Sequence, residues 1–294
     1  MHIDPFQLER FFARYEFKVK YLLSPSDCES LAMTEVLALA QEETLRLWQG
    51  LKLGYTESPG HPLLRETVAA LYQAITRDEV VITVPEEGIF IAMHALLEPG
   101  DHVIVIHPAY QSLHAVAHAI GCDVTTWGLE VNENGWRLDL ERLKHSITDR
   151  TRLIVINFPH NPTGFLPSRD ELEAVITLAR KRGIYIFSDE MYRLMEYDPE
   201  RRLPAVCDAY ERGISLSGLS KAFALPGLRI GWLATRDLAL IERWLICKDY
   251  TTICSSAPSE ILGVMALQAR EPILARPMGI IRENLCYAAK FFAV

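Results

Sequence analysis

The sequence lacks several features that mark common protein classes. Its six cysteines are scattered and none forms a C-x-x-C pair, which argues against a zinc knuckle or a redox motif and indicates reduced thiols. It has no run of basic residues, and its net charge of -8 disfavours a nucleic acid partner. No apolar stretch is long enough to span a bilayer, and residues 1–12 lack the apolar region of a signal peptide. These absences predict a soluble, cytoplasmic protein.

Several catalytic and metal-binding signatures are also missing. Neither the G-x-x-x-x-G-K-[ST] phosphate loop nor the G-x-S-x-G nucleophile elbow occurs. His114 and His118 are four residues apart and could share one helix face, but no third ligand follows at a recognisable spacing. We therefore expect no metal site.

What the sequence does contain is a regular alternation of apolar runs and helical stretches. The chain has 294 residues, of which 49% are hydrophobic, enough for a sizeable core. Strands are expected at 80–84, 102–108, 153–159, 183–190 and 214–220, and helices at 6–15, 30–49, 62–75, 88–97, 110–120, 139–146 and 168–182. Continuous apolar strands separated by helices predict an α/β fold with a mostly parallel sheet covered by helices on both faces.

The segment SLSGLSKAFALPGLRIGW (215–232) combines a lysine with residues suited to a bulky anionic ligand. Lys221 follows small polar residues, and Arg229 lies eight positions later between two glycines. Small residues let the backbone approach a ligand closely. A lysine amine can condense with an aldehyde, and its pKa falls readily when it is partly buried. An arginine can bind a phosphate through a bidentate fork. From spacing alone, a solvated loop explains this segment equally well.

Three further segments place polar or aromatic residues after apolar strands. NFPHNPTG (157–164) has the composition of a turn, and Asp189 in IFSDEMY (186–192) could cap a helix. Tyr110 in HPAYQSL (107–113) could be an ordinary buried tyrosine. In parallel sheets, however, ligand-binding groups gather where strands end.

The lysine segment resembles the pattern S-x-S-K-x-(F/Y)-x-x-x-G-x-R-x-G of the class I/II aminotransferases, which are fold-type I enzymes dependent on pyridoxal 5'-phosphate (PLP). The matching residues are Ser220, Lys221, Phe223, Gly227, Arg229 and Gly231. The resemblance implies that Lys221 forms the Schiff base with PLP and shuttles a proton at the substrate α-carbon. It implies that Ser220 and Arg229 hold the phosphate. The serine usually found three residues before the lysine is Gly218 here, with Ser217 one place further back.

The other three segments resemble family motifs and occur in the family order. By this resemblance, Asn161 and Tyr192 bind the 3-oxygen of the pyridine ring. Asp189 lies beneath the ring nitrogen and keeps it protonated, which makes the ring a better electron sink. Tyr110 stacks on the ring.

Two further cofactor contacts are expected from the resemblance. The family has a glycine-rich turn at residues 80–89, where this sequence has Pro85, which lacks an N–H. The backbone amides of Glu86 and Glu87 are therefore expected to meet the phosphate at a helix start, with both carboxylates pointing away. Tyr55 matches the family tyrosine that reaches the phosphate of the neighbouring subunit, which implies a homodimer with shared active sites. The alternative is that Tyr55 packs within its own chain.

The resemblance extends over about residues 20–270 and implies three regions. Residues 1–50 would contribute to a small domain and to dimer contacts, residues 51–245 would form the large PLP-binding domain, and residues 246–294 would begin a C-terminal small domain that is incomplete. The family's arginine motif for the substrate carboxylate does not occur, so that role is assigned to no residue. We expect the missing part of the small domain to leave apolar surface exposed and to weaken substrate binding more than cofactor binding.

The activity implied is that of a PLP-dependent aminotransferase, which moves an amino group between an amino acid and a 2-keto acid. Two alternatives use nearly the same residues and stay open at this point. One is a PLP-dependent lyase or cyclase acting on an amino acid. The other is a PLP-binding protein that has lost activity through truncation.

Overall fold

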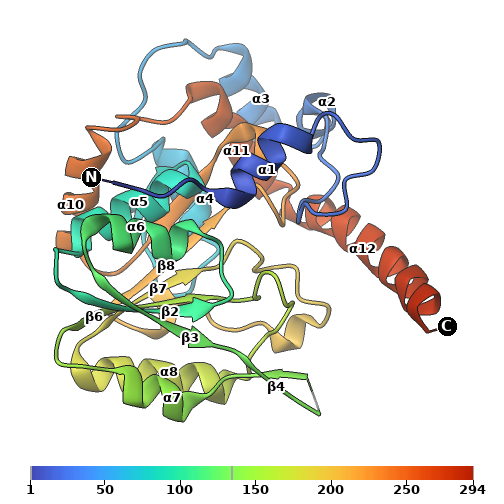
Figure 1. Cartoon of the computed structure of the whole chain (residues 1–294). Helices are drawn as coiled ribbons and strands as arrows, with labels where there is room; N and C mark the ends of the chain where they lie inside the picture. The colour runs from blue at the N-terminus through green and yellow to red at the C-terminus, as the bar shows by residue number, and fades with distance from the viewer. Residues whose placement is uncertain (1, 134, 294) are drawn as a thin grey trace.

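A seven-stranded sheet forms the centre of the molecule. The computed structural model describes residues 2–133 and 135–293 (Figure 1). In spatial order the strands are β1 (Val80–Thr83), β9 (Gly231–Ala234), β8 (Gly213–Gly218), β7 (Tyr185–Asp189), β6 (Thr151–Asn157), β2 (His102–His107) and β3 (Asp123–Gly128). Strand β9 is antiparallel to both of its neighbours, and the other pairs are parallel. The predicted α/β fold with a mostly parallel sheet is confirmed.

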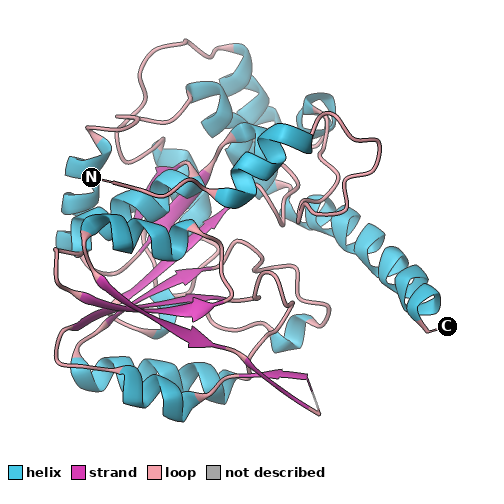
Figure 2. Cartoon of the chain, viewed as in Figure 1, coloured by secondary structure: helices cyan, strands magenta, loops and turns pink. Residues whose placement is uncertain are grey.

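Helices cover both faces of this sheet, as Figure 2 shows. Along β2, Val103 and Val105 belong to one core cluster, whereas Ile104 and Ile106 belong to another. Helices α5 (Pro85–Leu96), α6 (Ser112–Ile120) and α10 (Leu238–Lys248) pack on the first cluster, and α7 (Leu140–Ser146), α8 (Arg169–Arg182) and α9 (Val206–Ala209) pack on the second. Because both faces are covered, successive side chains of the strand are all apolar, which is why the strands were visible as apolar runs.

A third core cluster lies where the antiparallel strands β1 and β9 meet a further group of helices. Ile82 and Trp232 contribute from the strands, and the Trp232 indole donates a hydrogen bond to the Tyr72 hydroxyl (2.7 Å). The helices that supply buried side chains here are α2 (Met33–Ala38), α4 (Pro62–Ala69), α11 (Ala257–Gln268) and the start of α12 (Arg270–Phe292). Beyond Pro277, α12 projects from the body of the molecule (Figure 1).

The expected helix over 30–49 is two helices, so this prediction was wrong. Helix α2 ends at Ala38, and α3 (Glu42–Gln49) begins after Gln41, whose backbone is extended (φ -71°, ψ 152°). The break lets Val36 of α2 and Trp48 of α3 both reach the third core cluster. No glycine or proline marks the break, so the periodicity of apolar residues could not reveal it.

Several short elements were not predicted from the sequence. They are β3, β9, the hairpin of β4 (Glu130–Asn132) and β5 (Gly135–Arg137), and the 3-10 turns η1 (Arg77–Glu79), η2 (Pro199–Arg201) and η3 (Pro226–Leu228). The short helix α1 (Gln7–Tyr15) matches the expected helix at 6–15.

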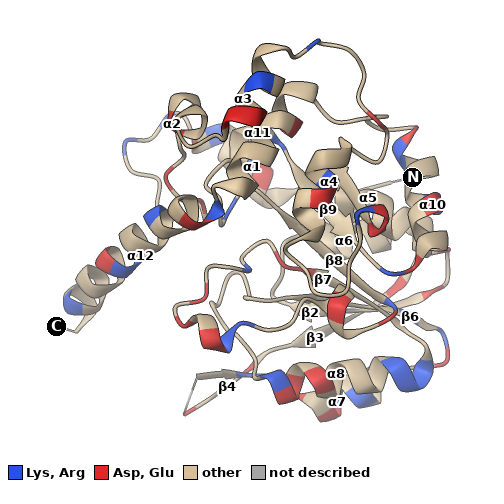
Figure 3. Ribbon diagram, turned by 180° about the vertical axis from the view of Figure 1, so that it is seen from behind, with Lys and Arg blue, Asp and Glu red and all other residues tan. Residues whose placement is uncertain are grey.

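Charged side chains are distributed over the outer helices with both signs mixed, as Figure 3 shows for α7 and α8. Helix α8 has two acidic residues in its first turn and three basic residues in its last turn, and its dipole favours both. The Ser168 hydroxyl and the Glu171 carboxylate cap its first turn reciprocally. Within the two described ranges, no helix has both the length and the hydropathy that crossing a bilayer requires.

Candidate active site

A cavity of about 370 Å³ lies at the edge of the sheet where the parallel strands end. Part of its lining comes from the ends of β6, β7 and β8 and from the segments that follow β1, β2, β6, β7 and β8, and the N-terminal segment supplies another part. Strand β1 is antiparallel to β9, and β9 is antiparallel to β8, so β1 runs in the same direction as β8 and ends at the same edge of the sheet. This is the usual place for a ligand in an open α/β sheet, and the volume is typical of small-molecule sites.

Most residues singled out in the sequence line this one cavity. They are Glu86, Tyr110, Asn161, Asp189, Tyr192, Ser220, Lys221 and Arg229. The lining does not include Glu87 or Tyr55. Tyr55 is 92% exposed and borders a separate groove between the loop at residues 50–57 and the start of α11.

Lys221 follows β8 and extends its amine into the cavity. The amine forms an ion pair with the Asp27 carboxylate and lies 3.5 Å from the Ser26 hydroxyl. Burial by itself lowers the pKa of the Lys221 amine. The nearby Tyr192, Asp27 and Asp189 raise the pKa by more than this, so that it lies above its usual value. Partial burial can lower the pKa of a lysine, but here the tyrosine and the two carboxylates near the amine outweigh that effect.

Asp189 is the last residue of β7 and is 6% exposed. One carboxylate oxygen accepts a hydrogen bond from the backbone N–H of Met191 (3.1 Å). Burial raises the pKa of Asp189 to about 6, and the charge of Glu190 adds to this shift. A ligand that brings a hydrogen-bond donor or a positive charge would therefore favour the ionised form of this buried carboxyl group.

Asn157 fixes the corner between β6 and β7, and the sequence reasoning missed it. Its side-chain amide donates to the carbonyl of Asp189 (2.9 Å), and its side-chain oxygen accepts from the backbone N–H of Asn161 (2.9 Å). It lines the cavity although it is 1% exposed. Its signal in the sequence was a polar residue ending an apolar strand immediately before the turn.

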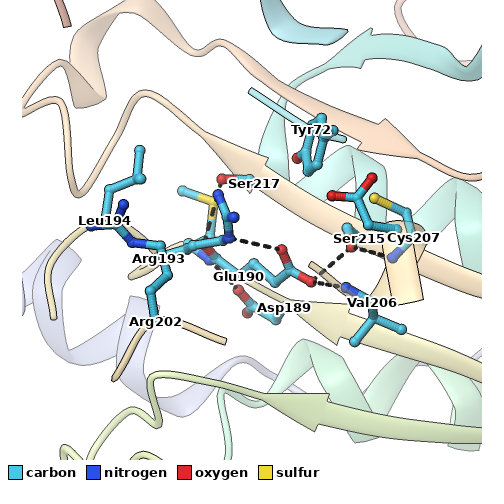
Figure 4. Close-up of polar contacts among 12 residues, drawn as sticks. Tyr72, Asp189, Glu190, Arg193, Leu194, Arg202, Val206, Cys207, Ser215 and Ser217 are labelled. Carbon is cyan, nitrogen blue, oxygen red and sulfur yellow. Dashed lines mark hydrogen bonds and ion pairs between the residues drawn. The ribbon is translucent and has the colours of Figure 1, made fainter. Parts of the chain in front are cut away.

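Glu190 points away from the cavity, into the protein interior (Figure 4). Its carboxylate accepts hydrogen bonds from the Ser215 hydroxyl (2.7 Å) and the backbone N–H of Val206 (2.9 Å), and Arg193 lies 4.0 Å away. Burial raises the pKa of this carboxyl group too. Adjacent residues at the end of β7 thus direct one carboxylate to the cavity and one to the core, as the alternation of a strand requires.

The two tyrosines of the cavity bind to the N-terminal segment. The Tyr192 hydroxyl donates to the Ser26 hydroxyl oxygen (2.6 Å). The Tyr110 hydroxyl donates to the Glu9 carboxylate (2.8 Å), and the Phe6 ring lies 4.8 Å from the Tyr110 ring. The N-terminal residues in the lining are Leu8, Glu9, Phe12, Glu16, Pro25, Ser26 and Asp27. The sequence held no motif that pointed to them.

The start of α5 differs from the expectation in one respect. The Glu86 carboxylate lines the cavity and accepts from the Ser112 hydroxyl (3.3 Å), and burial raises its pKa to about 7. Glu87 turns away, as expected, and accepts from the Thr83 (2.8 Å) and Thr252 (2.8 Å) hydroxyls. The expectation that both carboxylates point away was wrong because consecutive helical residues project about 100° apart.

Two further residues of the lysine segment, Ser220 and Arg229, line the cavity. Ser220 is buried, and Arg229 is exposed with its backbone in the left-handed region (φ 55°). Ser217, which stands one place before the family's serine position, donates its hydroxyl to the carbonyl of Glu190 (3.4 Å) instead. The cavity therefore brings together an amine, a buried carboxylate, two tyrosines and a guanidinium. Such a set suits an aromatic aldehyde that has a protonated ring nitrogen and a phosphate.

Comparison with protein families places most of the chain in one of them. The model of aminotransferase class I and II matches residues 20–272. A probable N-succinyldiaminopimelate aminotransferase of Mycobacterium tuberculosis is 34% identical over 239 residues, which cover 78% of this chain and 60% of that protein. Capreomycidine synthase of Streptomyces vinaceus is 31% identical over 283 residues, which cover 94% of this chain and 71% of that protein. The chain thus spans about 60% of the length of the first of these relatives.

Solved structures show the same architecture. A PLP-dependent aminotransferase from Streptococcus suis superimposes with a TM-score of 0.91 and 33% identity over 99% of this chain and 77% of its own. The PLP-dependent cyclase OrfR gives a TM-score of 0.90 with 26% identity over 100% of this chain and 76% of its own. On the strength of the matched family model and these similarities, the chain belongs to the class I and II aminotransferases, the fold-type I family whose cofactor is pyridoxal 5'-phosphate.

Proposed function

We propose that the protein is an aminotransferase that moves an amino group from an amino acid to a 2-keto acid. The observation that supports this most is that Lys221, Asp189 and Asn161, far apart in the sequence, line one cavity at the strand ends. The family motifs assign all three to the cofactor. Amino acids and keto acids are accordingly the proposed substrates.

The cavity residues fit PLP at the ring end. When bound, the cofactor supplies an aldehyde for attachment of amines and a ring that stabilises negative charge at the substrate α-carbon. Asp189 would hold a proton on the ring nitrogen, a role for which its burial and its spare acceptor oxygen suit it. Asn161 and Tyr192 would hold the ring oxygen, and Tyr110 would hold the ring.

At the phosphate end, the proposed contacts are the Ser220 hydroxyl, the Arg229 guanidinium and the first amides of α5, including those of Glu86 and Glu87. The first N–H groups of a helix have no acceptor within it and favour anions. The Glu86 carboxylate opposes this preference, but its raised pKa of about 7 lets it take up a proton when a phosphate binds nearby.

Lys221 is the proposed base, which would take up and hold the proton of the substrate α-carbon. A base must be neutral to take a proton, whereas the Asp27 carboxylate raises the pKa of this amine. Catalysis therefore requires the ion pair between Lys221 and Asp27 to open. The tyrosines and the N-terminal segment cover the cavity and reduce access of water to it.

A second candidate is a PLP-dependent cyclase. Capreomycidine synthase is similar to 94% of this chain, a larger share than the 78% covered by the first relative, and the OrfR structure superimposes on all of it. The proposed early proton transfer by Lys221 is common to both activities. Formation of aminated cofactor in a single half-reaction favours the aminotransferase, whereas a cyclic product with unchanged cofactor favours the cyclase.

We also propose that the protein is a cytoplasmic homodimer with shared active sites. Leu53, Tyr55, Tyr250 and Ile253 are exposed on two loops that a hydrogen bond between Thr56 and Ser255 (3.3 Å) joins. Exposed apolar side chains on adjacent loops suit a subunit interface. All six cysteines are free thiols, which suits a reducing compartment. Within this arrangement, we propose that residues 51–245 form the cofactor-binding domain and that residues 1–50 and 246–294 belong to a smaller one.

The decisive experiment is attachment of the cofactor to one residue. The 294-residue protein is incubated with PLP, reduced with borohydride and digested, and the labelled peptide is identified by mass spectrometry. We expect the label on Lys221, its loss in Lys221→Ala, and its retention in Lys144→Ala, which removes an exposed lysine of α7. A label on another lysine of the wild type contradicts the proposal. Amino acids are then added to the loaded protein, and aminated cofactor is measured by absorbance.

A further inference from the structure

We propose that His160 is a positioning residue that fastens the segment of Asn161 to the segment of Tyr110, and so holds the Asn161 side chain at the place where the cofactor ring binds. This inference rests on the proposed function, from which it takes the role of Asn161. His160 is not among the described residues that line the cavity of Lys221 and Asp189, so it would act through its neighbour Asn161.

The His160 ring is buried, and both of its nitrogen atoms are hydrogen-bonded. The residue is 2% exposed. Nε2 lies 2.7 Å from the carbonyl oxygen of Pro108, and Nδ1 lies 2.7 Å from the Thr163 hydroxyl oxygen. A carbonyl oxygen can only accept, so Nε2 carries the hydrogen and donates it. Burial lowers the pKa of His160, which keeps the ring neutral and leaves Nδ1 to accept from the Thr163 hydroxyl.

The bond from Nε2 joins two segments that follow neighbouring strands. Residues 108–111 follow β2, residues 158–168 follow β6, and these two strands are parallel neighbours. The strands end before either segment begins, so strand pairing does not fix the segments relative to each other. Within the described ranges, the bond of His160 is the one hydrogen bond between the two segments. Because the first segment holds Tyr110 and the second holds Asn161, this bond ties together two residues that line the cavity.

The Asn161 side chain depends on its backbone for its position. Its backbone N–H donates to the Asn157 side-chain oxygen (2.9 Å), but its side-chain amide makes no hydrogen bond within residues 2–133 and 135–293. The backbone N–H of His160 donates to the Phe165 carbonyl (2.9 Å), and the His160 carbonyl accepts from the Gly164 N–H (2.7 Å). These bonds close the turn on itself, and the ring bond anchors the closed turn to the segment after β2. A donor held in place in advance loses less freedom when its ligand binds.

The experiment measures how much the ring oxygen of the cofactor contributes to binding. The 294-residue protein without cofactor is titrated with PLP and with 3-deoxypyridoxal 5'-phosphate, which lacks this oxygen and keeps the aldehyde, the ring nitrogen and the phosphate. The Kd of each is read from the absorbance of the bound ligand. We expect the wild type to bind PLP about tenfold more tightly, the effect of hydrogen bonds to one oxygen. A general loss of stability weakens both ligands and leaves this ratio unchanged, so the ratio separates positioning from a merely structural role.

Two variants separate the contacts of the His160 ring. Asparagine places its amide near the position of Nδ1 and does not reach Pro108, whereas glutamine places its amide nitrogen near Nε2 and can donate to that carbonyl. We therefore expect the ratio to fall to about threefold or less in His160→Asn and to stay within about twofold of the wild type in His160→Gln. His145→Asn makes the same change at an exposed histidine of α7 that contacts the Glu141 carbonyl (2.7 Å), and it should keep the wild-type ratio.

A ratio that falls in both His160 variants, or in neither, overturns the inference. If His160→Asn does not fold, His160→Gln still decides, because a fall of its ratio contradicts the role of the bond to Pro108 and an unchanged ratio supports it. Asn161→Ala shows whether the proposed function itself is at fault, and its ratio should fall at least as far as that of His160→Asn. If Asn161→Ala keeps the wild-type ratio, the proposed role of Asn161 fails and the inference fails with it. If only the His160 variants depart from expectation, the proposed function stands.

Discussion

Replacing Asp189 with asparagine should stabilise the protein when no cofactor is present. The carboxyl group is nearly fully buried, and its pKa is raised from 3.8 to about 6. The raised pKa means that the folded protein favours the neutral form of this carboxyl group. The contribution of the group to stability is fully present below its unfolded pKa and is lost as the pH rises through its folded pKa. A shift of about two units corresponds to a destabilisation of about 3 kcal/mol by the charged form at pH 8, and about 1.5 kcal/mol at pH 5.

Asparagine has the same shape as aspartate and no charge, and its side-chain oxygen can still accept from the Met191 N–H. The free energy of unfolding of the cofactor-free Asp189→Asn variant should therefore exceed that of the wild type by about 1.5 kcal/mol at pH 5 and about 3 kcal/mol at pH 8. Urea unfolding followed by circular dichroism measures both values. The affinity for PLP should change in the opposite direction, falling by about tenfold or more, because the protonated ring nitrogen loses its charged partner.

The matched control is Asp149→Asn. This carboxylate is exposed and pairs with Arg182 on the surface (3.2 Å), so its replacement should change stability by less than about 0.5 kcal/mol at either pH. The reasoning is refuted if Asp189→Asn is no more stable than the wild type at pH 8. A gain that is the same at both pH values would also refute it, because titration of Asp189 would then not be the cause.

Three further outcomes are expected. Glu190→Ala should lower the free energy of urea unfolding by about 3 kcal/mol, because it leaves the buried Ser215 hydroxyl and Val206 N–H without their acceptor; a loss below 1 kcal/mol would contradict the buried network. Glu86→Gln should tighten PLP binding about threefold or more at pH 8.5 and little at pH 6, because the carboxylate is charged only above its pKa of about 7; fluorescence titration at both pH values checks this. Gly213→Ala should destabilise the fold by about 3 kcal/mol or more in thermal unfolding, because an added Cβ would lie 2.2 Å from the carbonyl oxygen of Val206; an unchanged Tm would contradict it.

Much of the fold could be predicted because its strands are buried on both faces. Such strands appear as uninterrupted apolar runs, and each of the five expected runs overlaps an observed strand. The start of α8 was also predicted, at residue 168, where the structure shows that Ser168 and Glu171 form a capping box. Strands β3 and β9 were not predicted. β3 contains exposed and polar residues at the sheet edge, and β9 has only four residues, the first two of which belong to the lysine motif.

The cavity residues that could be predicted all follow strand ends. Tyr110, Asn161, Asp189 and Lys221 each belong to a motif fixed by a neighbouring strand, so the sheet brings them together wherever the intervening helices run. Asn157 and Glu190 were missed, although they lie within predicted segments. Their importance comes from hydrogen bonds to other strands and loops, and a linear pattern does not contain these.

The sequence by itself determined the α/β architecture, the family and the position of Lys221, the proposed catalytic lysine, because local periodicity and short motifs encode each of them. The tertiary structure alone decided what surrounds that lysine. Asp27 meets Lys221 across 194 positions, and Glu9 meets Tyr110 across 101. Such contacts depend on the path of the N-terminal segment over the completed sheet, which no local pattern specifies. They also set the direction of the Lys221 pKa and the charge of the cavity, because electrostatic interactions depend on distance in space and not on separation along the chain.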